Sequence, residues 1–130
     1  MRNKRGVHMK PEIRFHIRDS NRPTELAIGP GKVALLEAIG QTGSITSSAR
    51  KLGMSYRRAW LLVDETNRCL VRPAVQTAAG GRSGGGSTLT PVGVELVRRY
   101  RAVEHQTRLA VSRRLRSLLR TMPGANSPGQ

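Results

Sequence analysis

Residues 44–60 of the chain read SITSSARKLGMSYRRAW. This stretch predicts two short helices joined by a tight turn. The first helix begins near Thr46 and ends at Gly53, a residue type that suits the turn. Ser55 is the predicted N-cap of the second helix, and Ala49 is small where the two helices must approach each other. Such a pair suits the major groove of duplex DNA, because the groove admits one helix whose N-terminal residues reach the base edges.

The second helix is expected to span about residues 55–69. Its apolar side is formed by Ala59, Leu62, Val63 and Thr66. Tyr56, Arg57 and Arg58 fall in the first turn and are expected to point away from that side. Cations in a first turn oppose the helix macrodipole, at a cost of about 0.3–1 kcal/mol each, so selection for stability alone does not favour them. They are either DNA contacts, which the basic composition favours, or an ordinary solvated helix start.

A β-hairpin is predicted after this helix. The strands are residues 75–77 and 87–90, and the loop between them has five glycines within residues 80–86. The loop ends in Gly-Gly-Ser without a lysine, which argues against a phosphate-binding loop of the Walker type. Arg82 is expected at the tip of this wing, on the DNA backbone or in the minor groove; a solvated hairpin tip is the alternative. The candidate DNA-binding residues are Ser44, Thr46, Ser47, Ser55, Tyr56, Arg57, Arg58 and Arg82.

The flanking segments complete the predicted order of strand, three helices, hairpin and long helix. Residues 13–18 alternate apolar and basic side chains, which predicts a half-buried strand. A helix is expected to open at Gly29-Pro30-Gly31 and to end at Gly40 or Gly43. Thr90-Pro91 opens the long helix, expected to continue through Leu115 and Leu118. Its apolar stripe is formed by Leu96, Tyr100, Val103, Thr107 and Ala110 or Val111.

These elements predict a mainly α fold with a small β-hairpin, a winged helix-turn-helix with a long C-terminal dimerisation helix. We expect a disordered basic arm over residues 1–10, the DNA-binding domain with its C-terminal helix over 11–120, and a flexible tail over 121–130. The arginines of the last helix are expected to form mostly its solvated face.

The composition indicates a polyanionic partner. Lys and Arg number 23 against 8 Asp and Glu, a formal net charge of +15. An anionic membrane surface is less favoured, because no basic amphipathic segment carries large apolar anchors. Aromatic residues are only 3% of the chain, too few for a platform that stacks single-stranded bases. Sequence-specific binding to double-stranded DNA is therefore favoured, and a non-specific architectural or RNA-associated basic protein is the alternative.

Other functional classes find little support in the residues. The single cysteine, Cys69, allows no intrachain disulfide and is expected to be a small buried residue, with a redox switch as the weaker alternative. His8, His16 and His105 are too far apart to indicate a metal site. No catalytic triad or carboxylate pair can be assembled, so neither an enzyme nor a cofactor is expected. Trp60 is expected in the core. With no signal peptide and no apolar run of about 20 residues, a cytoplasmic location is predicted.

The chain resembles the DNA-binding half of the ModE-type molybdenum-dependent regulators, whose winged helix is shared with the LysR-type class. The resemblance rests on the stretch from Ser44 to Asn67, with its Ser-Tyr-x-x-Ala-Trp string, and on the glycine wing at 79–86 followed by Leu-Thr-Pro-Val-Gly at 89–93. It covers roughly residues 30 to 105. It implies a homodimer that binds a pseudo-palindromic operator, with the long helix supplying much of the dimer interface.

Two features depart from that family's pattern. Family members usually carry a C-terminal molybdate-binding region, whereas no strand-rich segment follows the long helix here. We therefore expect no small-molecule effector to bind within this chain. Leu61 stands where the family favours a polar residue. An exposed leucine there would either touch thymine methyl groups or cover part of the wing.

Overall fold

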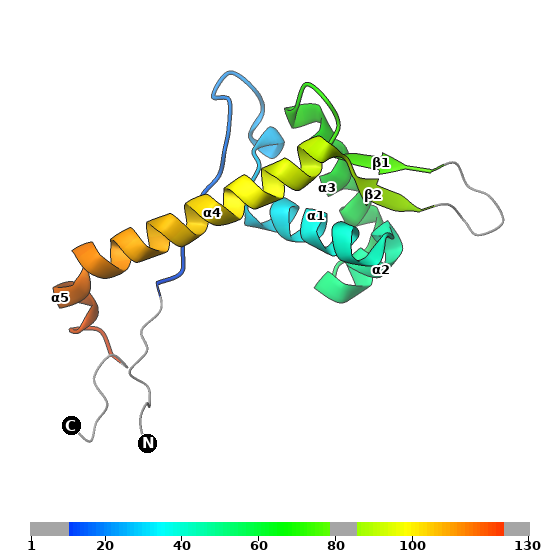
Figure 1. Ribbon diagram of the computed structural model, residues 1–130. Helices are drawn as coiled ribbons and strands as arrows, with labels where there is room; N and C mark the ends of the chain where they lie inside the picture. Colours follow the sequence, from blue (N-terminus) through cyan, green and yellow to red (C-terminus); the bar gives the residue numbers. More distant parts are fainter. Residues whose placement is uncertain (1–10, 79–85, 124–130) are drawn as a thin grey trace. The chain divides into compact units, whose positions relative to one another are not determined.

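The computed structural model describes residues 11–78 and 86–123 (Figure 1). The described chain is mainly helical with one small antiparallel sheet, as the sequence predicts. It divides into two compact units. One unit is Arg14–Tyr100. The described residues of the other unit are 11–13 and 101–123. The predicted basic arm at 1–10, most of the glycine loop with Arg82, and the last seven residues of the predicted tail lie outside the described residues.

Three helices form the centre of the Arg14–Tyr100 unit. They are α1 (Pro30–Thr42), α2 (Ile45–Leu52) and α3 (Tyr56–Cys69). A left-handed glycine ends each of the first two: Gly43 has φ 71° and Gly53 has φ 69°. The predicted bounds are confirmed to within a residue, with Gly43 rather than Gly40 ending α1.

The larger of two apolar clusters joins these helices to the chain that follows them, and a second cluster is formed by Ile28, Val33 and Tyr100. Each helix contributes its buried stripe, and the α3 residues Ala59, Leu62, Val63 and Thr66 are all buried, as expected. Because the buried residues lie along one side of α3, the opposite side of the helix faces solvent. The larger cluster is formed by Leu35, Leu36, Ile39, Ile45, Ala49, Ala59, Leu62, Val63, Ala74 and Val75.

The predicted hairpin is present as β1 (Val75–Thr77) and β2 (Ser87–Leu89), paired antiparallel with Val75 opposite Leu89. The side chain of Asn67 ties it to α3. Its Oδ1 accepts from the backbone N–H of Ala74 at 2.8 Å and of Val75 at 3.1 Å, and its Nδ2 donates to the Val75 carbonyl at 3.2 Å. These bonds satisfy backbone groups at the start of β1, so the hairpin is held at a set place beside the helix.

The long helix α4 (Pro91–Arg114) begins as predicted, with Thr90 as its cap. The Thr90 hydroxyl accepts from the Gly93 N–H at 3.1 Å and donates to the Pro73 carbonyl at 2.7 Å. Gly93 is required by close packing, because a Cβ there would lie 2.3 Å from the Ala74 carbonyl oxygen.

The strand predicted for residues 13–18 is wrong. The segment makes a single isolated bridge, between Ile17 and Ile28, with two backbone hydrogen bonds of 2.8 Å. Phe15 instead stacks on Tyr100 of α4, with ring centroids 4.1 Å apart, and the buried Tyr100 hydroxyl donates to the Phe15 carbonyl at 2.6 Å. Alternating side chains predicted an extended segment, but a strand also needs a neighbouring strand over several residues.

The long helix continues past Arg114 with one irregularity. Leu115 has φ −108° and ψ 21°, and the short helix α5 (Arg116–Leu119) follows it. Backbone hydrogen bonds from Leu115 to Val111 and from Leu119 to Leu115 run across this point. The chain is therefore helical through Leu118 as predicted, except that Leu115 divides it into two helices. Among the described helices, none has the length and apolar character needed to cross a membrane.

Candidate nucleic-acid interface

The turn between α2 and α3 forms as the local sequence predicts. Ser44 caps α2 by accepting from the Ser47 N–H, and Ser55 caps α3 by accepting from the Arg58 N–H, each at 3.0 Å. Within the turn, the Met54 N–H donates to the Ala49 carbonyl at 2.9 Å. Two of the candidate DNA-binding serines, Ser44 and Ser55, therefore already have a structural task, since each side-chain oxygen satisfies a helix N–H.

The first turn of α3 presents the three residues on which the sequence interpretation depends. Tyr56 is 52% exposed, and Arg57 and Arg58 are also exposed. In the part of the chain that the structure describes, no acidic side chain pairs with either arginine. Two unneutralised cations at the positive end of a helix dipole favour an anion from outside. Their role as DNA contacts remains a prediction.

The start of α2, the start of α3 and the base of the hairpin meet around one pocket. It has a volume of about 210 Å³ and places Ser44 and Thr46 beside Tyr56. Ser47 is not among the lining residues, and Arg82 lies outside the described residues. The lining consists of Ser44, Ile45, Thr46, Tyr56, Trp60, Thr77, Ala78, Gly86 and Ser87. The structure thus brings together three of the predicted contact residues from two helices.

Trp60 does not lie in the core, contrary to expectation. It is 38% exposed and lines the pocket just described. Its ring packs edge-to-face on Tyr56, with centroids 6.2 Å apart and an interplanar angle of 77°. Trp60 follows the buried Ala59 directly, and a helix turns by about 100° per residue, so the two side chains cannot point the same way.

The sequence interpretation also missed part of the outward surface of α3. A groove of about 770 Å³ is lined by Ser55, Arg57, Arg58, Trp60, Leu61 and Asp64. Residues 57, 60, 61 and 64 follow the spacing i, i+3, i+4, i+7, which places them on one helix face. The helical spacing that predicts the buried face of α3 also predicts this outward face, so the outward face could have been found from the sequence.

A buried ion pair fixes α3 against α1 and the short 3₁₀ helix η1 (Thr24–Leu26). Lys32 Nζ lies 3.2 Å from Glu65 Oε1 and donates to the carbonyls of Ala27, at 2.7 Å, and of Glu25. Lys32 is 7% exposed and Glu65 is 9% exposed. The ammonium has three acceptors for its three donors, so burial leaves it satisfied. Neither residue was singled out from the sequence, although Glu65 interrupts the buried stripe of α3.

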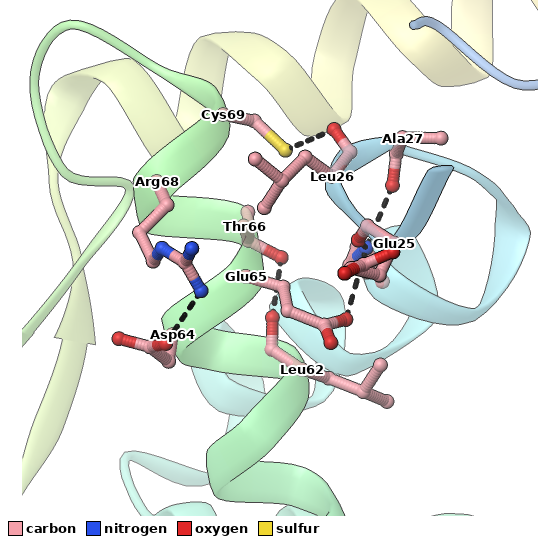
Figure 2. Close-up of polar contacts among 10 residues, drawn as sticks. Glu25, Leu26, Ala27, Leu62, Asp64, Glu65, Thr66, Arg68 and Cys69 are labelled. Carbon is pink, nitrogen blue, oxygen red and sulfur yellow. Dashed lines mark hydrogen bonds and ion pairs between the residues drawn. The ribbon is translucent and has the colours of Figure 1, made fainter. Parts of the chain in front are cut away.

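Cys69 lies at the end of α3, partly buried, and its thiol donates to the Leu26 carbonyl (Figure 2). Burial raises the pKa of the Cys69 thiol, because desolvation disfavours the thiolate. A thiol kept protonated is a poor nucleophile, which agrees with a packing role.

Arg98 and Arg99, in the third turn of α4, differ from the arginines of the first turn of α3 in having an acidic neighbour. Glu95 accepts from Arg98 Nε at 3.2 Å and from Arg99 Nε at 2.5 Å. These two guanidinium groups lower the pKa of Glu95 to about 2. Arg98 and Arg99 are thus partly neutralised within the helix, whereas Arg57 and Arg58 are not. In the two described stretches, no cluster of three or more His, Cys, Asp or Glu residues could hold a metal ion.

No protein-family model matches the chain. It is 48% identical over 81 residues to the molybdenum-pterin-binding protein MopB of Rhodobacter capsulatus, covering 62% of this chain and 30% of that protein. It is 40% identical over 87 residues to the molybdenum transport protein ModE of Azotobacter vinelandii, covering 67% and 32%. It is 37% identical over 76 residues to the DNA-binding transcriptional dual regulator ModE of Escherichia coli, covering 58% and 29%. The chain spans about a third of the length of these relatives. Its homologues are therefore molybdenum-related proteins of the ModE and Mop kind.

Proposed function

We propose that this chain is a ModE-type transcription regulator that binds specific sequences of double-stranded DNA. The observation that carries the proposal is the first turn of α3, beside the α2–α3 turn, where Arg57 and Arg58 are exposed and have no acidic partner within residues 11–78 and 86–123. A relative named as a DNA-binding transcriptional regulator shares 37% identity over 76 residues. In this proposal α2 and α3 form the helix-turn-helix and the hairpin forms the wing.

The wing adds a second contact in this arrangement. Asn67 holds the start of β1 against α3, and the Ser87 N–H donates to the Gly43 carbonyl at 3.0 Å at the start of β2. Since both strands are anchored near the reading helix, the loop between them is expected to reach the DNA backbone or minor groove while α3 occupies the major groove.

The test is the ratio of affinities for a selected and a random duplex. Fragments bound from a random-sequence pool are sequenced, and the most enriched sequence is synthesised as the selected duplex. Its binding is then measured in competition with random duplex of equal length at physiological salt. We expect the selected duplex to bind about 10³-fold or more tightly, the range found for specific DNA-binding proteins. A ratio near one, with affinity that collapses steeply as salt rises, would instead indicate a non-specific basic protein.

We propose further that the chain acts as a homodimer through the part of α4 beyond Tyr100. Val103 is 45% exposed there, and Thr107 and Ala110 follow at i+4 and i+7 on the same face. Leu109 on α4, Leu115 between the two helices and Leu118 on α5 are also exposed. A second copy that covers these side chains would remove them from water, and two-fold pairing suits a palindromic operator.

Replacing Val103 and Ala110 together by Glu is expected to convert the dimer to a monomer, because paired copies would bury four carboxylates without partners. Sedimentation velocity measures the change. The matched control is Ala102→Glu, an exposed position one residue away and on a different side of the helix. A double variant that remains dimeric, or a wild-type chain that is monomeric at micromolar concentration, would show that the dimer interface lies elsewhere or is absent.

A further inference from the structure

The outward face of α3 carries two large apolar side chains next to each other. Trp60 is 38% exposed and Leu61 is 46% exposed, and both line the groove that also contains Arg57 and Arg58. Single exposed apolar residues are common on protein surfaces and need no explanation. Two adjacent ones in a groove that two arginines also line, on the helix proposed to read DNA, form a surface with a chemical preference.

This apolar pair is held in place by its surroundings. The side of α3 opposite Leu61 is packed into the core by Ala59 and Val63, so the helix cannot rotate to bury its outward face. Trp60 is in addition restrained by the edge-to-face contact with Tyr56. The apolar surface is therefore presented in a defined orientation before any partner arrives, which lowers the entropic cost of using it.

The charges around the groove indicate what covers it. The groove lining holds two arginines and one acidic residue, Asp64, which is itself paired with Arg68 at 3.5 Å. A second copy of this chain carries a formal charge of +15 and would bring like charges against Arg57 and Arg58. The partner should be anionic and should offer small apolar groups at the depth of Leu61. Duplex DNA meets both conditions, because phosphates line its grooves and the C5-methyl of thymine is the apolar group exposed on the base edges of the major groove.

We infer that Leu61, supported by Trp60, contacts thymine methyl groups and makes the protein prefer thymine in the segment that α3 covers. The inference rests on the proposed DNA-binding function and adds to it a specificity-determining surface. Arg57 and Arg58, which line the same groove, would supply the polar contacts, to guanine edges or to phosphate.

The experiment compares thymine with deoxyuridine, which pairs identically but lacks the C5-methyl. The duplex selected from the random pool is synthesised twice, once as selected and once with every thymine replaced by deoxyuridine. For the wild-type chain we expect the substituted duplex to bind about fourfold more weakly for each contacted methyl, the effect of leaving one CH₂-sized group unburied. In Leu61→Ala, the difference in affinity between the thymine and deoxyuridine duplexes should become much smaller. In the double variant Trp60→Ala with Leu61→Ala, it should disappear.

Val71→Ala is the matched control, because Val71 is a fully exposed apolar residue outside α3, and it should retain the wild-type difference. All variants alter exposed side chains, and thermal unfolding confirms that they fold. Deoxyuridine that weakens binding less than twofold in the wild type, or equally in the wild type and the double variant, overturns the inference while the proposed function stands. Failure of the wild type to prefer the selected duplex overturns both. A change of oligomeric state in Leu61→Ala shows the groove to be a protein interface and also overturns the inference.

Discussion

Replacing Arg57 and Arg58 by Ala is expected to lower the affinity for the selected duplex by about 10²- to 10³-fold while binding to random duplex falls far less. A bidentate contact between Arg and a guanine edge is worth about 1–3 kcal/mol of discrimination against the wrong base. Both side chains lie in the first turn of α3, exposed and without an acidic partner among the described residues. Competition binding against selected and random duplex, at one fixed salt concentration, measures the change.

The melting temperature of the Arg57→Ala, Arg58→Ala variant shows whether the two arginines are needed for DNA binding or for the stability of the fold. Two cations at the positive end of a helix dipole are mildly unfavourable, so their removal should leave the melting temperature unchanged or slightly raised. A control with the same change in net charge is Arg22→Ala with Arg72→Ala, two exposed positions outside α2 and α3. The control should weaken binding to both duplexes alike and only modestly, as expected for long-range attraction.

Other outcomes would assign these arginines differently. An equal fall in affinity for selected and random duplex would make Arg57 and Arg58 phosphate contacts rather than base contacts. The slope of log affinity against log salt concentration would then become shallower by about one for each lost contact. Unchanged binding would show that α3 does not enter the groove.

Replacing Lys32 by Met is expected to destabilise the Arg14–Tyr100 unit by about 3–5 kcal/mol, the usual loss when one member of a buried ion pair is removed. The change removes the counter-ion of Glu65, a residue that is only 9% exposed, and it removes the donor that satisfies the carbonyls of Glu25 and Ala27. Urea unfolding near neutral pH gives the loss as a shift of the midpoint at constant slope.

The double variant Lys32→Met with Glu65→Leu tests whether the charge or the packing matters. Removing both charges should restore much of the lost stability, because an apolar pair of similar size avoids the desolvation penalty. The carbonyls of Glu25 and Ala27 still lack a donor, so restoration should be incomplete. A loss below about 1 kcal/mol in the single variant would mean that the pair behaves like a solvated surface ion pair.

Local chemistry made the caps and turns predictable. Ser44, Ser55 and Thr90 each precede a helix and each accepts a backbone N–H of its first turn, while Gly53 adopts the left-handed conformation that ends α2. These interactions span at most four residues, so the sequence contains all the participants. The hairpin strands were predictable for a similar reason, since a glycine-rich loop leaves them close in the sequence.

Non-local contacts explain the errors. The alternation over residues 13–18 predicted a strand, but Phe15 found its partner in Tyr100, 85 positions along the chain. Trp60 is expected in the core because it neighbours Ala59 and can bridge toward the first helix. Its place on α3, directly after Ala59, turns it outward once Ala59 is buried. The buried pair of Lys32 and Glu65 joins α1 to α3, and no short-range pattern links the two residues.

The ends of α2 and α3 and the basic first turn of α3 can be predicted from local sequence, because caps and turns depend on neighbouring residues. The sides of α3 that are covered cannot be predicted in this way. Burial depends on the elements that pack against a helix, so the positions of Trp60 and Leu61 in an open groove and of Glu65 against Lys32 followed from three-dimensional packing.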